Sequence, residues 1–302
     1  MKTRLSFAII AVALVVLVGC ATTGGRYGEA FVNDHFIVGV DELASNLDND
    51  RLVILDVRGP EDYENGHIPG AVSLPISWLE RVEITDDGAE VTNLVLGAED
   101  ITPVFQDAGI DRRSRVVIYD AGGHVVAARV FWMLDYYGHE NIAVLDGGFA
   151  AWTTLGNSTS MEAPDIAVGN FIATPDPSKI ADFEYVQANL GSEATALCNA
   201  LSTSSFEEGA IPGSVNVPRR TTYTEGDTPV LRSAEEMVAL FEQVGIKQDT
   251  EVVFYCGRGY AAAQDYFVAR ALGLTNVRLY DGSLTDWRAR GGKLTPSGEP
   301  TT

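Results

Sequence analysis

The stretch EVVFYCGRGYAAAQDYF, residues 251–267, joins an apolar run to a helix-like segment through a single cysteine. Val252–Tyr255 is an unbroken β-forming run, which is typical of a strand buried on both faces of a parallel sheet. After Cys256 come two glycines on either side of Arg258, and then an alanine-rich segment with helical spacing that begins near Ala261. The pattern predicts a strand, a tight loop and a helix. In doubly wound α/β folds, ligands bind at this kind of junction.

Three features of the predicted loop favour a thiolate at Cys256 over the protonated thiol. The glycines permit the chain to curl so that several backbone N–H groups point inward. The first turn of the helix contributes its positive dipole end, and Arg258 contributes a full charge. Because the thiolate is the nucleophilic form, the sequence predicts that Cys256 attacks a substrate, with a buried structural cysteine as the alternative. The residues predicted to bind an anionic substrate are Gly257, Arg258, Gly259, Tyr260 and Ala261.

The chain repeats this pattern, since its two halves share the same order of motifs. LVILDVRGPEDYENGHIPGAVSLP (52–75) in the first half corresponds to TALCNALSTSSFEEGAIPGSVNVP (195–218) in the second. Matched residues lie roughly 140 positions apart, which is too long for a solenoid repeat and is typical of a duplicated domain. The matched pairs are Gly66 with Gly209, Asp120 with Cys256, and Trp152 with Trp287.

Short runs of valine, isoleucine and leucine alternate with helical patterns in both halves. Apolar strands without polar alternation are typical of a parallel sheet that is covered on both faces. The sequence therefore predicts an α/β protein with two tandem doubly wound domains, each with a parallel sheet flanked by helices. The predicted boundaries are residues 30–155 for the first domain, 156–172 for a linker, 173–294 for the second domain and 295–302 for a disordered tail.

Each half of the chain carries parts of one set of motifs: LDVR…GHIPGA, a six-residue loop after a strand, and a closing DGG or DGS before a tryptophan. Taken together, these motifs resemble those of the tandem-domain rhodaneses, a family of sulfurtransferases. The resemblance covers nearly all of the chain after residue 20. It implies that Cys256 in the second domain is catalytic and that Asp120 marks a non-catalytic first domain. It also implies a ping-pong reaction, in which the cysteine takes a sulfane sulfur from a small anionic donor and passes it to cyanide or a thiol. Neither a metal nor an organic cofactor is expected.

The loop C-G-R-G-Y-A departs from both loop patterns of that family. Loops for thiosulfate resemble C-R-K-G-V-T, whereas loops for 3-mercaptopyruvate resemble C-G-S-G-V-T. Gly257 follows the second pattern and Arg258 the first, while Ala261 lacks the threonine hydroxyl of both. Because Arg258 can meet the charge of a small dianion, thiosulfate is the predicted donor. The alternatives are a 3-mercaptopyruvate sulfurtransferase and a non-catalytic envelope protein that binds a partner or a sulfur compound.

A second departure concerns the cations around the site. Leu201 stands where an arginine of the family helps to bind the donor, and Arg219 and Arg220 are predicted to supply substitute charge. The cysteine phosphatases share this general loop but need an arginine six residues after the cysteine to clamp phosphate. That position is Ala262, so a phosphatase is set aside.

Other residues with potential chemistry are interpreted as structural. In the first domain, Asp56 and Arg58 are predicted to form an ion pair and His67 to lie in a turn, without a partner histidine at metal-ligand spacing. Cys198 ends an apolar run and is predicted to lie in the core. A redox-switching disulfide between Cys198 and Cys256 is the alternative, since their strands are expected to be near neighbours.

The first 20 residues have the pattern of a bacterial lipoprotein signal peptide. A positive MKTR start precedes the apolar run Leu5–Val18, which is too short to span a membrane, and LVGCA resembles a lipobox. Cleavage before Cys20 would make it the lipid-modified first residue. This predicts a protein anchored by its lipid to a membrane of the bacterial cell envelope, facing the periplasm in a Gram-negative cell. An ordinary secretory signal that contains a cysteine is the alternative.

The charge balance limits the partners of the protein. The chain has 42 acidic and 21 basic residues and a formal net charge of −21. Such a surface repels nucleic acid, so neither DNA nor RNA is an expected partner. Because two domains are already paired in one chain, a monomer is the predicted state.

Overall fold

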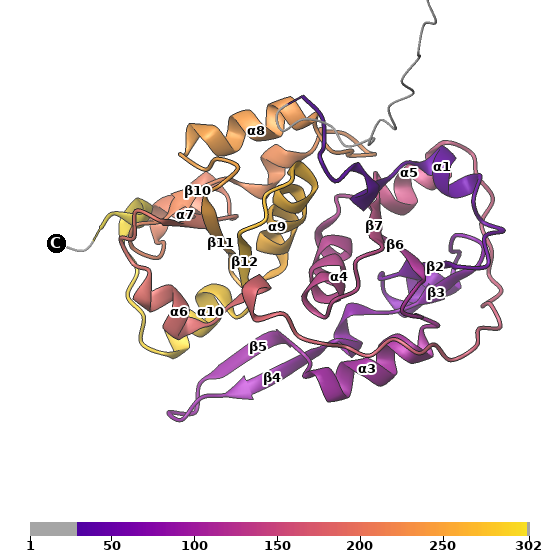
Figure 1. Cartoon of the computed structure of the whole chain (residues 1–302), viewed down its shortest axis with the longest axis horizontal. Coiled ribbons are helices and arrows are strands. Elements are labelled where there is room, and N and C mark those ends of the chain that lie inside the picture. Colours follow the sequence, from indigo (N-terminus) through magenta and orange to yellow (C-terminus); the bar gives the residue numbers. More distant parts are fainter. Residues whose placement is uncertain (1–28, 301–302) are drawn as a thin grey trace, which may run out of the picture.

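The computed structural model describes residues 29–300. The predicted signal peptide at residues 1–20, the predicted lipidation site Cys20 and residues 301–302 lie outside this described part. Within it, the two predicted α/β domains are confirmed, because each half of the chain forms a five-stranded parallel sheet flanked by helices. Figure 1 shows the two halves side by side, the first in indigo to magenta and the second in orange to yellow.

The first domain has its longest apolar strands at the centre of the sheet. The strand order is β1-β7-β6-β2-β3, and every pairing in it is parallel. The strands of this half are β1 (Ile37–Val38), β2 (Leu52–Asp56), β3 (Ala71–Ser73), β4 (Glu80–Ile84), β5 (Glu90–Val95), β6 (Arg115–Tyr119) and β7 (Ile142–Leu145), and its helices are α1 (Val40–Ala44), α2 (Pro60–Glu64), α3 (Ala98–Asp107), α4 (Val125–Tyr136) and α5 (Gly148–Thr154).

The second domain repeats the topology of the first. Its strand order, β10-β9-β11-β12-β8, is the same arrangement read from the opposite edge, which confirms the duplication that the sequence predicts. The strands of this half are β8 (Ile180–Ala181), β9 (Thr195–Asn199), β10 (Val215–Asn216), β11 (Glu251–Tyr255) and β12 (Val277–Tyr280), and its helices are α6 (Phe183–Ala188), α7 (Thr203–Glu208), α8 (Ala234–Gln243), α9 (Tyr260–Leu272) and α10 (Ser283–Ala289).

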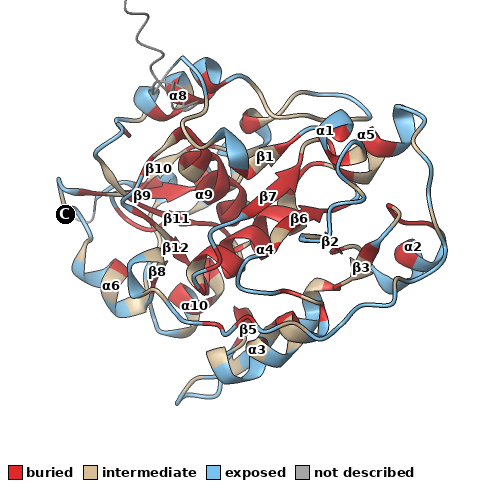
Figure 2. Ribbon diagram, turned by 45° about the vertical axis from the view of Figure 1, so that its right-hand side comes forward, coloured by how far each residue is buried: buried red, intermediate tan, exposed pale blue. Residues whose placement is uncertain are grey.

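The helices α4 and α9, which follow the two equivalent loops, pack against each other and join the domains. The rings of Phe131 and Phe267 meet edge to face with centroids 4.9 Å apart. The Tyr266 hydroxyl donates a hydrogen bond of 2.7 Å to Asp135 Oδ2 across the same interface. Both helices are buried along most of their length, so they form one continuous interior with the sheets (Figure 2).

The hairpin β4–β5 belongs to the first domain but reaches across to the second, beneath which it lies in Figure 1. The backbone N–H of Val95 donates to Asp281 Oδ2 at 2.9 Å, and Arg290 Nη2 donates to Glu83 Oε1 at 2.7 Å. In the opposite direction, the N–H of Leu231 in the second domain donates to Asp146 Oδ1 of the first at 2.9 Å. Each domain therefore carries an aspartate that accepts a backbone N–H from the other.

The segment predicted to be a linker lies along the first domain. Ser160 and His67 exchange backbone hydrogen bonds of 2.9 Å, and Nε2 of His67 lies 3.1 Å from the carbonyl oxygen of Glu162. Phe171 is buried against the core. The connection is therefore held against the surface of the domain that precedes it, rather than being a free tether.

The predicted disorder of residues 295–302 is wrong for residues 295–300. Thr295 and Ala210 exchange backbone hydrogen bonds of 2.9 Å. Gly298 accepts a hydrogen bond of 2.6 Å from the N–H of Gly213 and has a φ of +64°. A Cβ at Gly298 would lie 2.7 Å from the carbonyl oxygen of Ser214, so only glycine permits this close approach. The composition of the tail suggested disorder, but the backbone of the tail pairs with the second domain.

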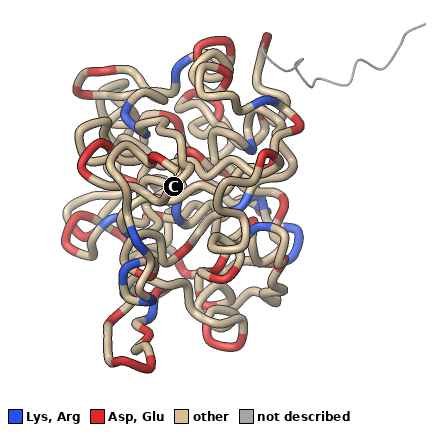
Figure 3. Tube along the Cα trace, turned by 90° about the vertical axis from the view of Figure 1, so that its left-hand side faces the viewer, with Lys and Arg blue, Asp and Glu red and all other residues tan. Residues whose placement is uncertain are grey.

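Acidic residues are spread along the whole chain trace in Figure 3, with lysine and arginine in smaller groups between them. Within residues 29–300, none of the helices has both the length and the apolar character needed to cross a bilayer.

Candidate active site around Cys256

Cys256 follows β11 directly and is held by the first turn of α10, the helix that follows β12. Its backbone N–H donates to Ser283 Oγ at 3.1 Å, and its carbonyl oxygen accepts from the N–H of Leu284 at 3.0 Å. The carbonyl oxygen of the next residue, Gly257, accepts from both the N–H and the hydroxyl of Thr285. Cys256 is 2% exposed. The position of the cysteine is therefore set by two neighbouring strands and not by its loop alone.

The loop after Cys256 presents a row of unused hydrogen-bond donors. None of the backbone N–H groups of residues 257–262 donates to another group in the described part of the chain. The first internal bond of the helix runs from Ala263 to Gly259 at 3.1 Å. These N–H groups and the positive end of α9, which has 13 residues, form a cradle suited to an anion next to the sulfur.

The two loop glycines have different surroundings. Gly259 has a φ of +84°, and a Cβ there would lie 2.7 Å from the carbonyl oxygen of Asp281 and 2.8 Å from Nη1 of Arg129. A Cβ at Gly257 would meet nothing within 4 Å. The loop is therefore packed tightly on its inner side at Gly259 and open at Gly257.

The side chains predicted to bind substrate do not all face the same way. Arg258 is exposed and forms no ion pair within residues 29–300. Tyr260 is turned toward the first domain, where its hydroxyl donates to Glu80 Oε2 at 2.7 Å, and burial raises the pKa of this phenol. Ala261 packs against the core. Of the three, Arg258 is the one whose polar group is exposed and has no partner in the described part of the chain.

Leu201 has an apolar side chain, and the residues around it are apolar too. Its side chain packs against the core of the second domain, and its N–H donates to Asn199 Oδ1 at 2.8 Å. In the first domain, Arg58 Nη2 lies 2.5 Å from Asp56 Oδ2 and donates to the carbonyl oxygen of Gly66 at 2.8 Å. The structural ion pair predicted there is confirmed. In the second domain, leucine and asparagine replace it.

The structure places Arg219 and Arg220 against the loop of the first domain. With Gly122, Gly123 and Tyr223 they line a cavity of about 470 Å³. Arg219 Nη1 donates to the Tyr223 hydroxyl at 3.0 Å. Arg219 Nη1 also lies 3.5 Å from Gln264 Oε1 on α9, the helix that follows Cys256. The role of the two arginines as substitute cations for the substrate stays a prediction.

Asp120 occupies in the first domain the place that Cys256 has in the second. Its carboxylate accepts hydrogen bonds from the N–H of Gly122 in its loop at 2.9 Å, and from the N–H groups of Val126 and Ala127 in the first turn of α4 at 3.1 and 3.3 Å. The cradle of the first domain is therefore filled by an internal anion, as a non-catalytic domain that serves as a scaffold would allow.

The second cysteine is part of the core. Cys198 on β9 is fully buried and pairs in register with Phe254, and burial raises the pKa of its thiol well above the usual range. The strands of Cys198 and Cys256 are neighbours as expected, but both cysteines are free thiols. The predicted core position is confirmed, and the alternative disulfide is absent from this structure.

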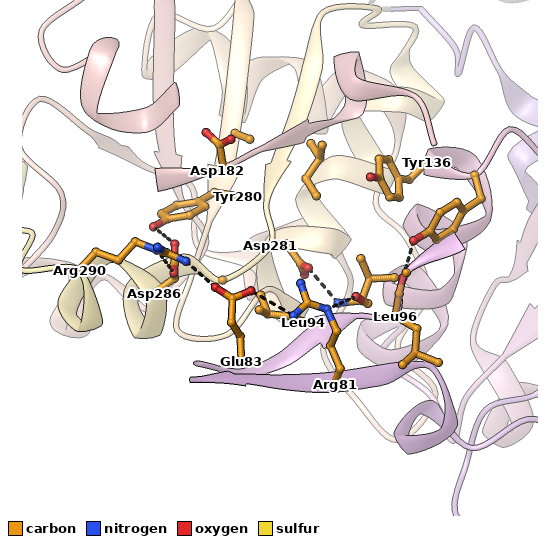
Figure 4. A pocket seen from close by; sticks show the side chains of 16 residues that line it. Arg81, Glu83, Leu94, Leu96, Tyr136, Asp182, Tyr280, Asp281, Asp286 and Arg290 are labelled. Carbon is orange, nitrogen blue, oxygen red and sulfur yellow. Dashed lines mark hydrogen bonds and ion pairs between the residues drawn. The ribbon is translucent and has the colours of Figure 1, made fainter. Parts of the chain in front are cut away.

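A second cavity, of about 240 Å³, lies between the domains on the far side of the turn at Asp281. Four of its charged side chains are paired with one another, as the dashed lines between Arg81, Glu83, Arg290 and Asp286 show in Figure 4. Because these charges are already satisfied, they offer little to a ligand. No group of three or more His, Cys, Asp or Glu side chains that could hold a metal ion occurs within residues 29–300.

Sequence reasoning missed Ser283 and Arg129. A signal for the serine was present, because the first half reads DGG where the second reads DGS, with Gly148 equivalent to Ser283. Both residues have positive φ, +57° at the glycine and +51° at the serine. A serine in a conformation that favours glycine marks a local strain of the kind found at functional sites. Arg129 carries no such signal, since its role depends on how the domains pack.

Comparison with known proteins agrees with this geometry. The rhodanese-like domain family matches residues 39–155 and 182–290. The chain is 29% identical to a 3-mercaptopyruvate sulfurtransferase of Escherichia coli (strain K12), over 84% of this chain and 95% of that protein. It is 28% identical to a thiosulfate sulfurtransferase of Pseudomonas aeruginosa, over 83% of this chain and 93% of that protein.

Solved structures show the same fold. The crystal structure of a 3-mercaptopyruvate sulfotransferase from Escherichia coli superposes with a TM-score of 0.73 at 28% identity, covering 82% of this chain and 98% of that chain. The tandem domains, the cysteine loop and these matches lead to one conclusion: the chain belongs to the rhodanese-like family and is a tandem-domain sulfurtransferase.

Proposed function

We propose that the protein transfers a sulfane sulfur from thiosulfate, through a persulfide on Cys256, to a thiophilic acceptor such as cyanide or a thiol. The contrast between the two loops carries this proposal. Asp120 fills the first cradle, whereas the N–H groups of residues 257–262 are unused beside the Cys256 sulfur. An open anion cradle next to a thiol suits a reaction in which thiolate, donor and persulfide are all anionic.

The chemistry balances without a cofactor. The Cys256 thiolate attacks the outer sulfur of thiosulfate and forms a new S–S bond. The original S–S bond breaks, and sulfite leaves with the bonding electron pair. In the second half-reaction, cyanide or a thiolate attacks the terminal sulfur of the persulfide and regenerates the Cys256 thiolate. The loop N–H groups stabilise the anionic sulfur in both steps.

Arg258 supports thiosulfate as the donor because this cation of the loop is exposed and forms no ion pair in the described part of the chain. Other observations support the two alternatives. Gly257 and the match to a 3-mercaptopyruvate sulfurtransferase favour that donor. The low exposure of Cys256 and the apolar Leu201 favour a binding protein without turnover.

The test is a sulfurtransferase assay on residues 21–302 with cyanide as acceptor and with thiosulfate and 3-mercaptopyruvate as parallel donors. We expect turnover with thiosulfate, and mass spectrometry should detect one added sulfur atom on the Cys256 peptide. Cys256→Ser should abolish both, while the matched control Cys198→Ser should retain both. Turnover with 3-mercaptopyruvate alone would support the first alternative. A folded protein inactive with both donors would support the binding role.

We further propose that the protein is a monomer in the bacterial cell envelope, anchored by lipid on Cys20 and facing the periplasm in a Gram-negative cell. The lipobox-like LVGCA supports this. Expression of the full chain should place the protein in the membrane fraction, and Cys20→Ala should release it or block its processing. Equal partitioning of the two forms would contradict the anchor. Light scattering on residues 21–302 tests the monomer.

A further inference from the structure

Arg129 belongs to the first domain but lies at the foot of the Cys256 loop in the second. It is 0% exposed, on the face of α4 that packs against α9. Its Nη2 donates to the carbonyl oxygen of Asn93 at 2.7 Å and to Asp281 Oδ1 at 2.5 Å, while its Nε lies 3.6 Å from Glu80 Oε1. Its guanidinium also lies over the rings of Trp132 and Tyr260, at 4.7 and 5.6 Å from their centroids.

The guanidinium touches the loop itself. A Cβ added to Gly259 would lie 2.8 Å from Nη1 of Arg129, so the loop backbone rests directly against this nitrogen. Nη1 and Nε are buried and make no hydrogen bond among the described residues. Nε faces Glu80 Oε1 at 3.6 Å, whereas Nη1 lies against the loop backbone at Gly259. A buried N–H site without a hydrogen bond costs stability, so the position of this guanidinium beside the loop calls for an explanation.

A second set of contacts leads from Arg129 to the cysteine. Asp281, which Arg129 holds through Oδ1, begins the turn that contains Ser283. Ser283 Oγ accepts the N–H of Cys256 at 3.1 Å and donates to the carbonyl oxygen of Tyr280 at 2.8 Å. A shift of Asp281 would therefore move the group that positions Cys256.

The charges near the loop give Arg129 an electrostatic role as well. Glu80 and Asp281 place two carboxylates against the underside of the loop, and the Tyr260 hydroxyl binds the first of these. Arg129 is the cation between them, and Arg258 is on the exposed side. Without Arg129, two negative charges would lie unopposed beneath a loop that must hold an anionic sulfur.

We propose that Arg129 is a positioning residue for the sulfur-transfer reaction, acting across the domain interface on the Gly259 backbone and on the Asp281–Ser283 turn. The inference rests on the proposed role of Cys256 as the sulfur-carrying thiolate. Under this proposal the first domain contributes to the reaction through Arg129, although the loop of the first domain carries Asp120 in place of a cysteine. The second domain has its reactive loop complete only when the first is docked against it.

The test compares Arg129→Met with Arg270→Met. Arg270 Nε lies 3.1 Å from Asp135 Oδ2, so its loss also removes an arginine ion pair from the α4–α9 interface, but away from the loop. The primary readout is the pH dependence of Cys256 alkylation by iodoacetamide in residues 21–302, followed on the Cys256 peptide by mass spectrometry. We expect Arg129→Met to move the alkylation profile to higher pH by about one unit. Arg270→Met should leave it in place.

Steady-state kinetics provide the second readout. Arg129→Met should lower kcat/KM for the sulfur donor by about 10-fold to 100-fold, the range expected when a reacting group is misplaced. Arg129→Lys keeps the charge but not the forked geometry, so it should recover most of the alkylation profile and less of kcat/KM. An alkylation profile for Arg129→Met equal to those of wild type and Arg270→Met would overturn the proposal.

Glu80→Gln keeps the test decisive if Arg129→Met does not fold. It removes one carboxylate from the cluster and leaves an oxygen that can still accept from Tyr260. The proposal predicts a shift of the alkylation profile to lower pH, opposite to that of Arg129→Met, and no shift would contradict it. Failure of the proposed function is distinguishable, since a wild-type protein without turnover would still give an alkylation profile for each variant.

Discussion

Asp120 and Cys256 head equivalent loops in the two domains. The Asp120 carboxylate accepts from the N–H groups of Gly122 and Val126, whose equivalents at Arg258 and Ala262 have no partner among the described residues. In all, three N–H groups of the first loop and the first turn of α4 donate to the Asp120 carboxylate, whereas those of residues 257–262 have no partner in the described part of the chain. One half of a duplicated fold has thus closed its anion cradle with a side chain, and the other keeps it open beside a thiol.

This relationship predicts the effect of replacing Asp120. Asp120→Ala leaves three N–H groups without their acceptor, so it should lower the free energy of unfolding by roughly 1–3 kcal/mol. Sulfur transfer should be retained within about threefold, because the substitution lies away from the Cys256 loop. Urea unfolding and the cyanide-acceptor assay measure the two effects. Asp120→Asn is the matched control and should lose less stability, since its amide oxygen still accepts. Loss of activity without loss of stability in Asp120→Ala would refute the scaffold role.

Gly259 and Gly257 provide a matched pair within one loop. Gly259→Ala combines a φ of +84° with a Cβ 2.7 Å from the Asp281 carbonyl oxygen, so the loop must move. We expect it to lower the free energy of unfolding by about 2 kcal/mol or more and to abolish most of the sulfur transfer. Gly257→Ala, whose Cβ meets nothing within 4 Å, should leave thermal stability unchanged. Equal thermal stability of the two variants would show that the close packing at Gly259 is not a constraint.

Two substitutions of Ser283 distinguish the effect of backbone strain from the effect of the hydrogen bond to Cys256. Ser283→Ala keeps the φ of +51° but removes the acceptor for the Cys256 N–H, while Ser283→Gly removes the acceptor and relieves the strain. Both should reduce kcat for sulfur transfer, by about tenfold. Ser283→Gly should be the more stable of the two by roughly 1 kcal/mol, because glycine suits positive φ. Wild-type kcat in both variants would exclude a role for this hydroxyl.

We expect the buried carboxyl group of Asp265 to make the free energy of unfolding depend on pH. It lies on α9, is 0% exposed, and neither carboxyl oxygen has a hydrogen-bond partner in the described part of the chain. Burial raises its pKa well above the usual range, so the folded protein retains a proton that the unfolded chain releases. The free energy of unfolding should therefore fall as pH rises above the ordinary pKa of aspartate, until the raised folded-state pKa is reached.

Substitution of Asp265 tests this sign. Asp265→Leu should raise the free energy of unfolding at neutral pH by about 1–3 kcal/mol and flatten its fall with pH. Asp265→Asn should also flatten the pH dependence but retain an unpaired polar group. The exposed control Asp107→Asn should change neither. Chemical unfolding at several pH values measures all four proteins, and a wild-type slope that persists in Asp265→Leu would rule out Asp265 as its source.

The tandem fold could be predicted because short stretches of sequence determine its strands, helices and loops. Apolar runs such as Val252–Tyr255 form the buried strands, and the repeated motifs identify the equivalence of Asp120 and Cys256. The helix after the cysteine begins at Tyr260, one residue from the predicted start. These features depend on residues close together in sequence.

What the sequence could not predict depends on the packing of the two domains. Arg129 is a single cation in an otherwise apolar helical segment, and its partners appear only when α4 packs against α9. Arg219 and Arg220 follow a motif of the second domain but face the loop of the first. The tail from Thr295 to residue 300 was expected to be disordered from its composition, yet its backbone pairs with Ala210.

The exchange of backbone N–H groups between the domains has a consequence for how the protein is made. Val95 and Asp281 are 186 residues apart in the chain, and Asp146 and Leu231 are 85 apart. The first domain leaves the ribosome first and folds as a unit, but the hairpin end at Val95 waits for its partner until nearly the whole chain has been synthesised. A chain truncated before Asp281 would therefore lack both the reactive loop's support and the hairpin's anchor. We therefore expect the Cys256 loop to become able to transfer sulfur only after the two domains have docked, late in folding.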